Sequence, residues 1–77
     1  MENSAILYVV PNCPLCQDAR EWLDARGVTY QERDVENDFG AFRSMVKLTH
    51  QRLVPVLHFN NQALVRPDGS QLTRLFL

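Results

Sequence analysis

The two cysteines of this 77-residue chain lie close together near its N-terminus, in the stretch "VVPNCPLCQDAREW". Only Pro14 and Leu15 separate Cys13 from Cys16. A Cys-x-x-Cys pair can exchange disulfides with a substrate, ligate a metal ion or form a small covalent staple. The context of the pair has to separate these three chemistries.

Disulfide exchange requires a thiolate, and a free thiol has a pKa of about 8.5. Lowering such a value to about 7 takes about 2 kcal/mol of preferential stabilisation of the anion. A helix dipole supplies about 0.3–1 kcal/mol, so N–H donation to sulfur must supply the rest. Pro14 suits a first helical turn, which puts Cys13 at the helix cap and Cys16 inside the turn. We therefore expect Cys13 to attack a disulfide and Cys16 to resolve the mixed disulfide.

The staple and the metal site are less favoured alternatives. Closing so small a loop stabilises a fold by only about 2 kcal/mol, and permanent disulfides are rare in a reducing compartment. His50 and His58 could in principle complete a tetrahedral zinc site with the cysteines, but the spacing does not follow a zinc-finger pattern. We expect no metal and no tightly bound cofactor.

Apolar spacing in the N-terminal half predicts three elements. Residues 5–10, "AILYVV", are typical of a central strand covered on both faces. Residues 14–26 repeat apolar side chains at helical spacing up to Gly27, and we expect Trp22 to pack on that apolar face rather than to contact substrate. Residues 28–35 alternate imperfectly and carry several charges, which predicts a strand near a sheet edge.

The C-terminal half predicts a helix, a hairpin and a last helix. Asn37 or Asp38 can cap the first of these helices. Residues 54–59 form a strand opened by a proline, and residues 60–65 supply a turn and a return strand. Asp68 begins a capping box for a short final helix.

The predicted order β-α-β-α-β-β-α implies an α/β fold in a single domain, residues 1–77. Strands joined by one helix should lie parallel with right-handed crossovers, and the hairpin adds an antiparallel pair. We therefore expect a four-stranded mixed sheet with helices on both faces. Ligands of such sheets gather outside the carboxyl ends of the parallel strands, where Cys13 would lie.

The charges exclude some classes of partner. Eight Lys and Arg residues face nine Asp and Glu residues with no run of one sign, which argues against nucleic acid or a membrane surface. No stretch approaches the roughly 18 apolar residues of a membrane span, and the opening lacks the basic start of a secretory signal. We expect a cytoplasmic monomer.

Three segments in order carry a family resemblance: "CPLC" between a strand and a helix, then "VTYQERDV", then "LVPVL". Over about residues 6–75 the chain resembles the glutaredoxin branch of the thioredoxin-like proteins. The resemblance implies that fold and an oxidoreductase that reduces protein or mixed disulfides and carries electrons. It also implies a cis bond before Pro55 and main-chain pairing of Val54 with an extended substrate. The expected substrate-binding residues are Pro14, Leu15, Val54, Pro55, Arg66 and Asp68.

The chain departs from common glutaredoxins in ways that bear on its electron donor. They carry "CPYC", a Lys three residues before the first cysteine and a "GG-C/T-D" turn, whereas this chain has Leu15, Val10 and "LVRPD" there. The "RPD" segment is similar to the "GFRPD" ending of NrdH-type redoxins, which take electrons from thioredoxin reductase. The chain also resembles small YruB-type proteins. Glutathione and thioredoxin reductase therefore both stay candidate donors.

Three further alternatives stay open at this point. The family resemblance implies that Asp68 binds the amine of glutathione, whereas the neighbouring residues favour a role as helix cap. Arg52, just before the Val54-Pro55 pair, either assists a thiolate or a partner's carboxylate or is simply solvated. The alternative function is a non-catalytic thiol module that binds a metal or an iron–sulfur cluster, or docks a partner through an exposed strand edge.

Overall fold

The computed structural model describes residues 4–76, which form four strands and three helices. In chain order these are β1 (Ala5–Val9), α1 (Pro14–Ala25), β2 (Tyr30–Asp34), α2 (Phe39–Thr49), β3 (Val56–Phe59), β4 (Gln62–Val65) and α3 (Gly69–Phe76). This is the order predicted from the apolar spacing. None of the helices in residues 4–76 has the length and apolarity needed to cross a bilayer.

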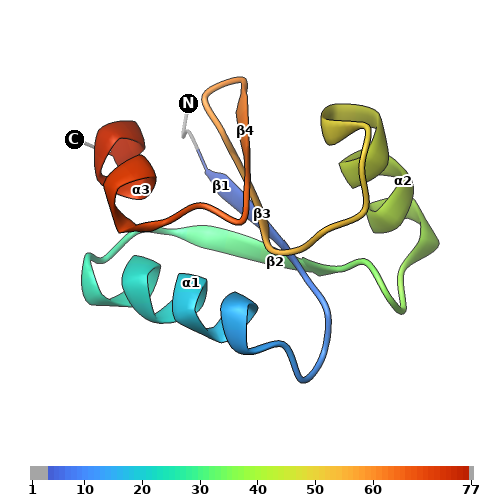
Figure 1. The fold of residues 1–77 in the computed structure, drawn as a ribbon, viewed down its shortest axis with the longest axis horizontal. Coiled ribbons are helices and arrows are strands. Elements are labelled where there is room, and N and C mark those ends of the chain that lie inside the picture. The colour runs from blue at the N-terminus through green and yellow to red at the C-terminus, as the bar shows by residue number, and fades with distance from the viewer. Residues whose placement is uncertain (1–3, 77) are drawn as a thin grey trace.

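The strands form one mixed sheet in the order β2-β1-β3-β4. β1 runs parallel to β2 and antiparallel to β3, and β3 and β4 form the antiparallel hairpin. Figure 1 shows α1 and α3 on one side of the sheet and α2 on the other. The expected mixed sheet with helices on both faces is confirmed, and the charged strand β2 lies at an edge as predicted.

The core lies where the two central strands meet the helices. Leu7 of β1 pairs with Leu57 of β3, and both side chains are fully buried. Leu23 of α1 and Met45 of α2 are also fully buried, one in a helix on each side of the sheet. The apolar run of β1 is thus explained by burial on both faces.

Three predicted strands are shorter in the structure, and the first of them, β1, ends at Val9 rather than at residue 10. The third strand begins at Val56 rather than at residue 54, because Pro55 has no N–H for the ladder. The Val54–Pro55 peptide bond is cis. β2 begins only at Tyr30, because the Val28 N–H donates to the Leu23 carbonyl (3.0 Å) and closes the end of α1. The turn at this end uses Gly27 at φ 68°, a conformation that suits glycine.

Side-chain caps fix the starts of the last two helices. Asp38 accepts a hydrogen bond from the Ala41 N–H (3.1 Å) at the start of α2. Asp68 accepts from the Gln71 N–H (2.9 Å), and the Gln71 side chain accepts in return from the Asp68 N–H (3.0 Å). The capping box predicted at Asp68 is therefore present.

Candidate functional site

The cysteine pair lies at the junction of β1 and α1. β1 ends at Val9, and α1 begins at Pro14 with Cys13 as its N-cap. The Cys13 Sγ accepts a hydrogen bond from the Cys16 N–H at 3.1 Å, so the sulfur takes the place of a capping oxygen. Both thiols are free; Cys13 is half-buried and Cys16 is 0 % exposed. One sulfur therefore faces the helix tip and the surface while the other is shielded.

Burial and the neighbouring sulfur raise the pKa of the Cys16 thiol to about 11. Burial is the largest cause, the hydrogen bond with Cys13 comes next, and the charge of Cys13 also contributes. The Val10 backbone and the charge of Arg20, which pairs with Glu32 at 2.7 Å, act in the opposite direction. Cys16 therefore keeps its proton at neutral pH while Cys13 is unmodified.

A loop around the cis bond between Val54 and Pro55 is tied to the turn before α3. The Arg66 N–H donates to the Pro55 carbonyl, and the Arg66 side chain donates through Nε to the Val54 carbonyl, both at 2.8 Å. The Val54 N–H donates to no other residue within 4–76. The Val54 carbonyl therefore already has one donor, whereas the Val54 N–H is available to an incoming chain.

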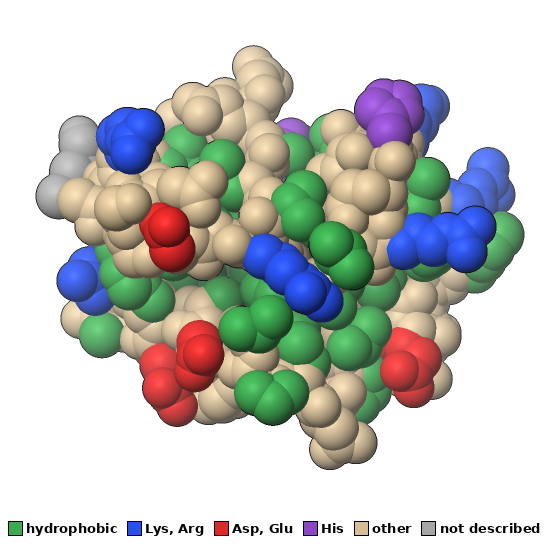
Figure 2. All heavy atoms as spheres, viewed as in Figure 1, with side chains coloured by type: hydrophobic (Ala, Val, Ile, Leu, Met, Phe, Trp, Pro, Cys, Tyr) green, Lys and Arg blue, Asp and Glu red, His purple; other side chains and the backbone are tan. Residues whose placement is uncertain are grey.

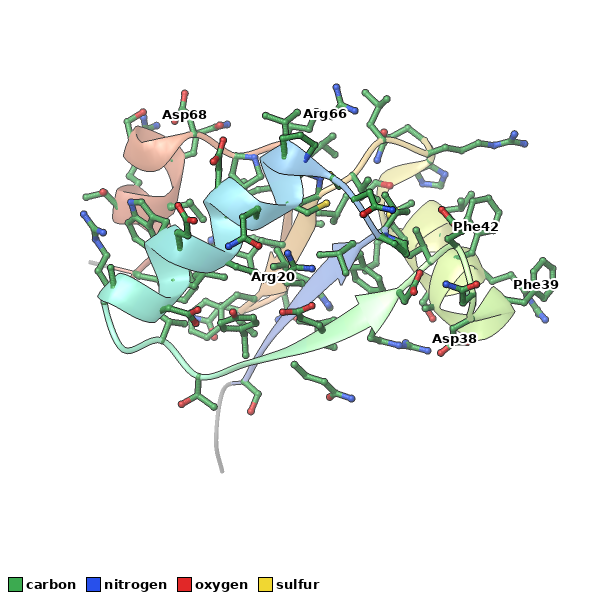
Figure 3. The ribbon with its side chains drawn as sticks, turned by 90° about the horizontal axis from the view of Figure 1, so that it is seen from below. Arg20, Asp38, Phe39, Phe42, Arg66 and Asp68 are labelled. Carbon is green, nitrogen blue, oxygen red and sulfur yellow. The ribbon has the colours of Figure 1, made fainter. Side chains whose placement is uncertain are left out.

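A groove of about 360 Å³ runs from the first turn of α1 to the start of α3. Its walls come from α1, the cis-proline loop, the turn after β4 and α3 (Leu15, Asp18, Ala19, Trp22, Pro55, Arg66, Pro67, Asp68, Gly69 and Leu72). Figure 3 shows Arg66 beside the first turn of α1 and Asp68 at the start of α3. The lining is mostly apolar with a guanidinium and two carboxylates, so it suits an amphipathic ligand.

The structure brings together Leu15, Pro55, Arg66 and Asp68, which line this one groove. Val54 and Pro14 are both absent from the lining; the Val54 carbonyl accepts from Arg66, which is part of it, and Pro14 is exposed on the first turn of α1. Hydrogen bonds from the Gln71 N–H and from Ser70 lower the pKa of the Asp68 carboxyl. The Asp68 carboxylate is thus already engaged by local donors as a helix cap.

Trp22 and Asp18 of the groove wall were missed by the sequence analysis. Trp22 packs against the core, as expected, with its ring 6.1 Å from that of Phe76, but it also lines the groove. The sequence could have indicated that Trp22 lines the same groove as Leu15, because the two residues stand at positions i and i+7 on one helix face. No comparable spacing in the sequence indicated the contact between the Arg66 side chain and Val54.

The other candidates lie apart from the groove. The Arg52 guanidinium is 6.0 Å from the Phe42 ring centroid, on the side of α2. His58 is half-buried in β3, and His50 is exposed at the end of α2. Within residues 4–76, no three His, Cys, Asp or Glu side chains converge as a metal-ligand set.

Comparison with known proteins places this fold and cysteine pair in a family. Residues 5–64 match the glutaredoxin family, so the chain belongs to this family of thiol oxidoreductases. A glutaredoxin-like 8.6 kDa protein of the rubredoxin operon of Clostridium pasteurianum is 25% identical over 69 residues, covering 90% of this chain and 92% of that protein.

Solved structures show the same fold. The glutaredoxin of Archaeoglobus fulgidus superposes with a TM-score of 0.86 at 17% identity, covering 95% of this chain and 85% of that one. The thioredoxin-like protein BC3987 gives a TM-score of 0.89 at 23% identity, covering 95% of this chain and 100% of that one. The family and the thioredoxin-like fold implied by "CPLC" and "LVPVL" are confirmed.

Proposed function

We propose that the protein reduces protein disulfides and mixed disulfides through the dithiol of Cys13 and Cys16. One observation carries the proposal: the half-buried Cys13 sulfur caps α1 and accepts the Cys16 N–H at 3.1 Å. The groove that a substrate can enter does not include the cysteines in its lining but begins at Leu15, which stands between them in the chain. The thiolate is the attacking form of a cysteine in disulfide exchange, and this sulfur lies at the N-terminus of the helix with an N–H donor facing it. Membership of the glutaredoxin family supports the same chemistry.

The exchange proceeds in two steps. The Cys13 thiolate attacks one sulfur of the substrate disulfide, forming a mixed disulfide and releasing the first substrate thiolate, which takes up a proton. Cys16 then loses its proton and attacks the Cys13 sulfur, which releases the second substrate thiolate and forms the Cys13–Cys16 disulfide. The substrate gains two electrons and the protein loses two. A dithiol donor or two thiol molecules must return them.

The raised pKa of Cys16 gives these steps their order. While Cys13 is a thiolate, its charge and its hydrogen bond help to hold the Cys16 proton. Both influences end when Cys13 enters a mixed disulfide, because that sulfur then carries no charge. Cys16 therefore becomes easier to ionise only after the first step has happened. In this order Cys16 stays a protonated thiol during the attack of Cys13 and becomes the nucleophile once the mixed disulfide has formed.

The substrate binds as an extended segment beside the two sulfurs. The free Val54 N–H donates to a substrate carbonyl, as an edge strand does to a peptide. Leu15 and Pro55 contact apolar groups, and Arg66 and Asp68, from the turn before α3, contact charged ones. Pro14 shapes the exposed first turn over which the segment passes. A cytoplasmic location and a monomeric state remain predictions from the sequence.

The cysteine roles are tested by trapping. Cys16→Ser should accumulate a mixed disulfide with a peptide disulfide at Cys13, visible by mass spectrometry, because no resolving thiol remains. Cys13→Ser should lose turnover and form no adduct. Full dithiol turnover by Cys13→Ser would overturn the assignment. Metal analysis of protein purified under reducing conditions checks the alternative thiol module, which should carry a metal or a cluster.

The electron donor is tested separately. Oxidised protein is offered glutathione with glutathione reductase, or thioredoxin reductase alone, and NADPH consumption is followed. The occupied Val54 carbonyl favours thioredoxin reductase, because glutathione in an extended pose needs main-chain acceptors as well as donors. Faster consumption in the glutathione arm would contradict this choice of donor and leave the cysteine chemistry in place.

A further inference from the structure

A second groove, of about 590 Å³, lies along the exposed side of α2 (Phe39, Gly40, Phe42, Arg43, Ser44, Val46 and Lys47). The rings of Phe39 and Phe42 stack with centroids 6.5 Å apart, and Phe39 is 71% exposed. Figure 3 shows Phe39 projecting outward near the start of the helix. Single exposed apolar residues are ordinary, but stacked aromatic rings in a groove mark an interaction surface.

Cationic side chains surround these rings. The Arg43 guanidinium is 5.6 Å from the Phe39 centroid, and Arg52 stands over Phe42 in the same way. Lys47 lines the groove as well. We call Phe39, Phe42, Arg43, Lys47 and Arg52 the α2 patch. Figure 2 shows Lys and Arg side chains gathered over α2.

These positive charges are uncompensated. Among residues 4–76, Arg43, Lys47 and Arg52 form no ion pair. The neighbouring carboxylate of Asp38 already accepts the Ala41 N–H and lies 3.9 Å from a different cation, Arg33. The whole chain has a net charge of −1, so the patch is a local concentration of positive charge rather than a general property. A surface of this kind complements an acidic partner.

The patch is continuous along the chain with the cis-proline loop, whose Pro55 lines the first groove. Arg52 and Leu53 directly precede the Val54–Pro55 bond, and Leu53 is half exposed (50%). A protein whose disulfide reaches Cys13 therefore lays adjoining surface over the cis-proline loop toward α2. Such continuity makes the patch an extension of one docking surface.

We propose that the α2 patch docks the protein whose disulfide is reduced at Cys13, and that it selects partners with acidic residues around an apolar side chain. This inference rests on the proposed disulfide-reductase function. It adds the class of protein substrate that the enzyme would select. The patch contributes long-range attraction through its cations and a desolvated contact through its two rings. The bond exchange at Cys13 is unchanged.

The probes are two synthetic peptides, each ending in a cysteine joined to 2-mercaptoethanol as a mixed disulfide. Each carries about ten further residues, which span about 33 Å when extended and exceed the 31 Å longest dimension of the molecule. One peptide alternates Glu with Leu and Phe, and the other has Lys in place of Glu. Reduced protein is mixed with each peptide, quenched in acid and analysed by chromatography. Bis(2-hydroxyethyl) disulfide is the small control substrate.

The wild type should reduce the Glu peptide about tenfold faster than the Lys peptide at low salt. This ratio should approach one in 1 M salt, where the Debye length falls to about 3 Å. Arg43→Glu should abolish the preference, while Arg74→Glu, the same charge change on α3, should preserve it. Phe39→Ala should slow both peptides about tenfold, the equivalent of about 1.4 kcal/mol, and Leu48→Ala should not. All four variants should reduce the small disulfide at the wild-type rate.

Equal rates for the two peptides in the wild type, or equal effects of Arg43→Glu and Arg74→Glu, would overturn the proposal. If the wild type fails to reduce the small disulfide, the proposed reductase function is wrong. Docking at the α2 patch is then tested separately, by binding. For that purpose a Glu peptide with Ser in place of Cys is titrated into nitrogen-15-labelled protein; shifts confined to residues outside the α2 patch would refute docking. Sedimentation with phosphatidylserine vesicles that depends on Phe39 would assign the patch to a membrane instead.

Discussion

At the scale of single residues, Arg66 determines which main-chain groups the site offers. Its Nε donates to the Val54 carbonyl at 2.8 Å, which leaves the Val54 N–H as the free group. Arg66→Ala should free the carbonyl and lower the KM for glutathione-linked disulfides about two- to tenfold, since a net hydrogen bond is worth about 0.5–1.5 kcal/mol. Steady-state kinetics with and without glutathione measures this change.

Arg66→Lys is the matched variant for this prediction. Lysine keeps the positive charge but lacks the planar guanidinium that reaches the carbonyl through Nε. It should resemble Arg66→Ala if the hydrogen bond is what restricts glutathione. A higher KM in Arg66→Ala that Arg66→Lys restores would show instead that the charge at this position binds the substrate.

The buried thiol makes a second prediction at this scale. Burial first, and then the neighbouring Cys13, raise the pKa of Cys16 to about 11, so the folded state favours its protonated form. This contribution to stability is complete below about pH 9 and is lost as the pH rises through about 11. Native protein treated with iodoacetamide at pH 8 should be alkylated at Cys13 long before Cys16, with the Cys16 initial rate rising near pH 11. Site-mapped mass spectrometry reports both rates, and similar rates at pH 8 would contradict the shift.

At the scale of elements, the sequence predicts those features that depend on near neighbours. Gly27 marks the end of α1, and the Asp68 capping box marks the start of α3, because both act within one helical turn. The long-range contact from Arg66 to Val54 could not be predicted. It depends on how β4 meets the cis-proline loop and on the positive φ of Arg66 (47°), which a residue before a proline rarely adopts.

The cap of α2 provides a test at the scale of the element. Asp38→Ala should lower the free energy of unfolding by about 1 kcal/mol, because the Ala41 N–H loses its acceptor. Asp38→Asn keeps a capping oxygen but loses the charge that faces Arg33, so it should remain near the wild type. Urea denaturation of the three proteins measures the effect. Equal losses in both variants would attribute the stabilisation to the ion pair.

At the scale of the whole molecule, the fold is as compact as is typical for its length. The radius of gyration is 11.5 Å, close to the roughly 11.5 Å typical of a 77-residue domain. A domain of this size has a stability of roughly 4–12 kcal/mol, at about 0.05–0.15 kcal/mol per residue. The loss of a single core side chain is therefore a large fraction of the total.

Leu57 tests this small margin. Its side chain is 0% exposed on the central strand β3, and truncation of such a leucine costs about 2–5 kcal/mol. Leu57→Ala should therefore unfold at a much lower denaturant concentration or fail to fold. Leu48→Ala, at a position 39% exposed, should change the stability by no more than about 0.5 kcal/mol. Equal denaturation midpoints for the two variants would show that Leu57 is not part of the stabilising core.

The hydrogen bond between the Cys16 amide and the Cys13 sulfur has a practical consequence. Its acceptor is a charged sulfur in the proposed reduced state and an uncharged one once Cys13 is bonded to any other sulfur. The chemical shift of that one amide proton should therefore move with each redox step. Nuclear magnetic resonance of the native chain, with no dye or reporter attached, could then measure the fraction of oxidised protein during the reaction with a substrate.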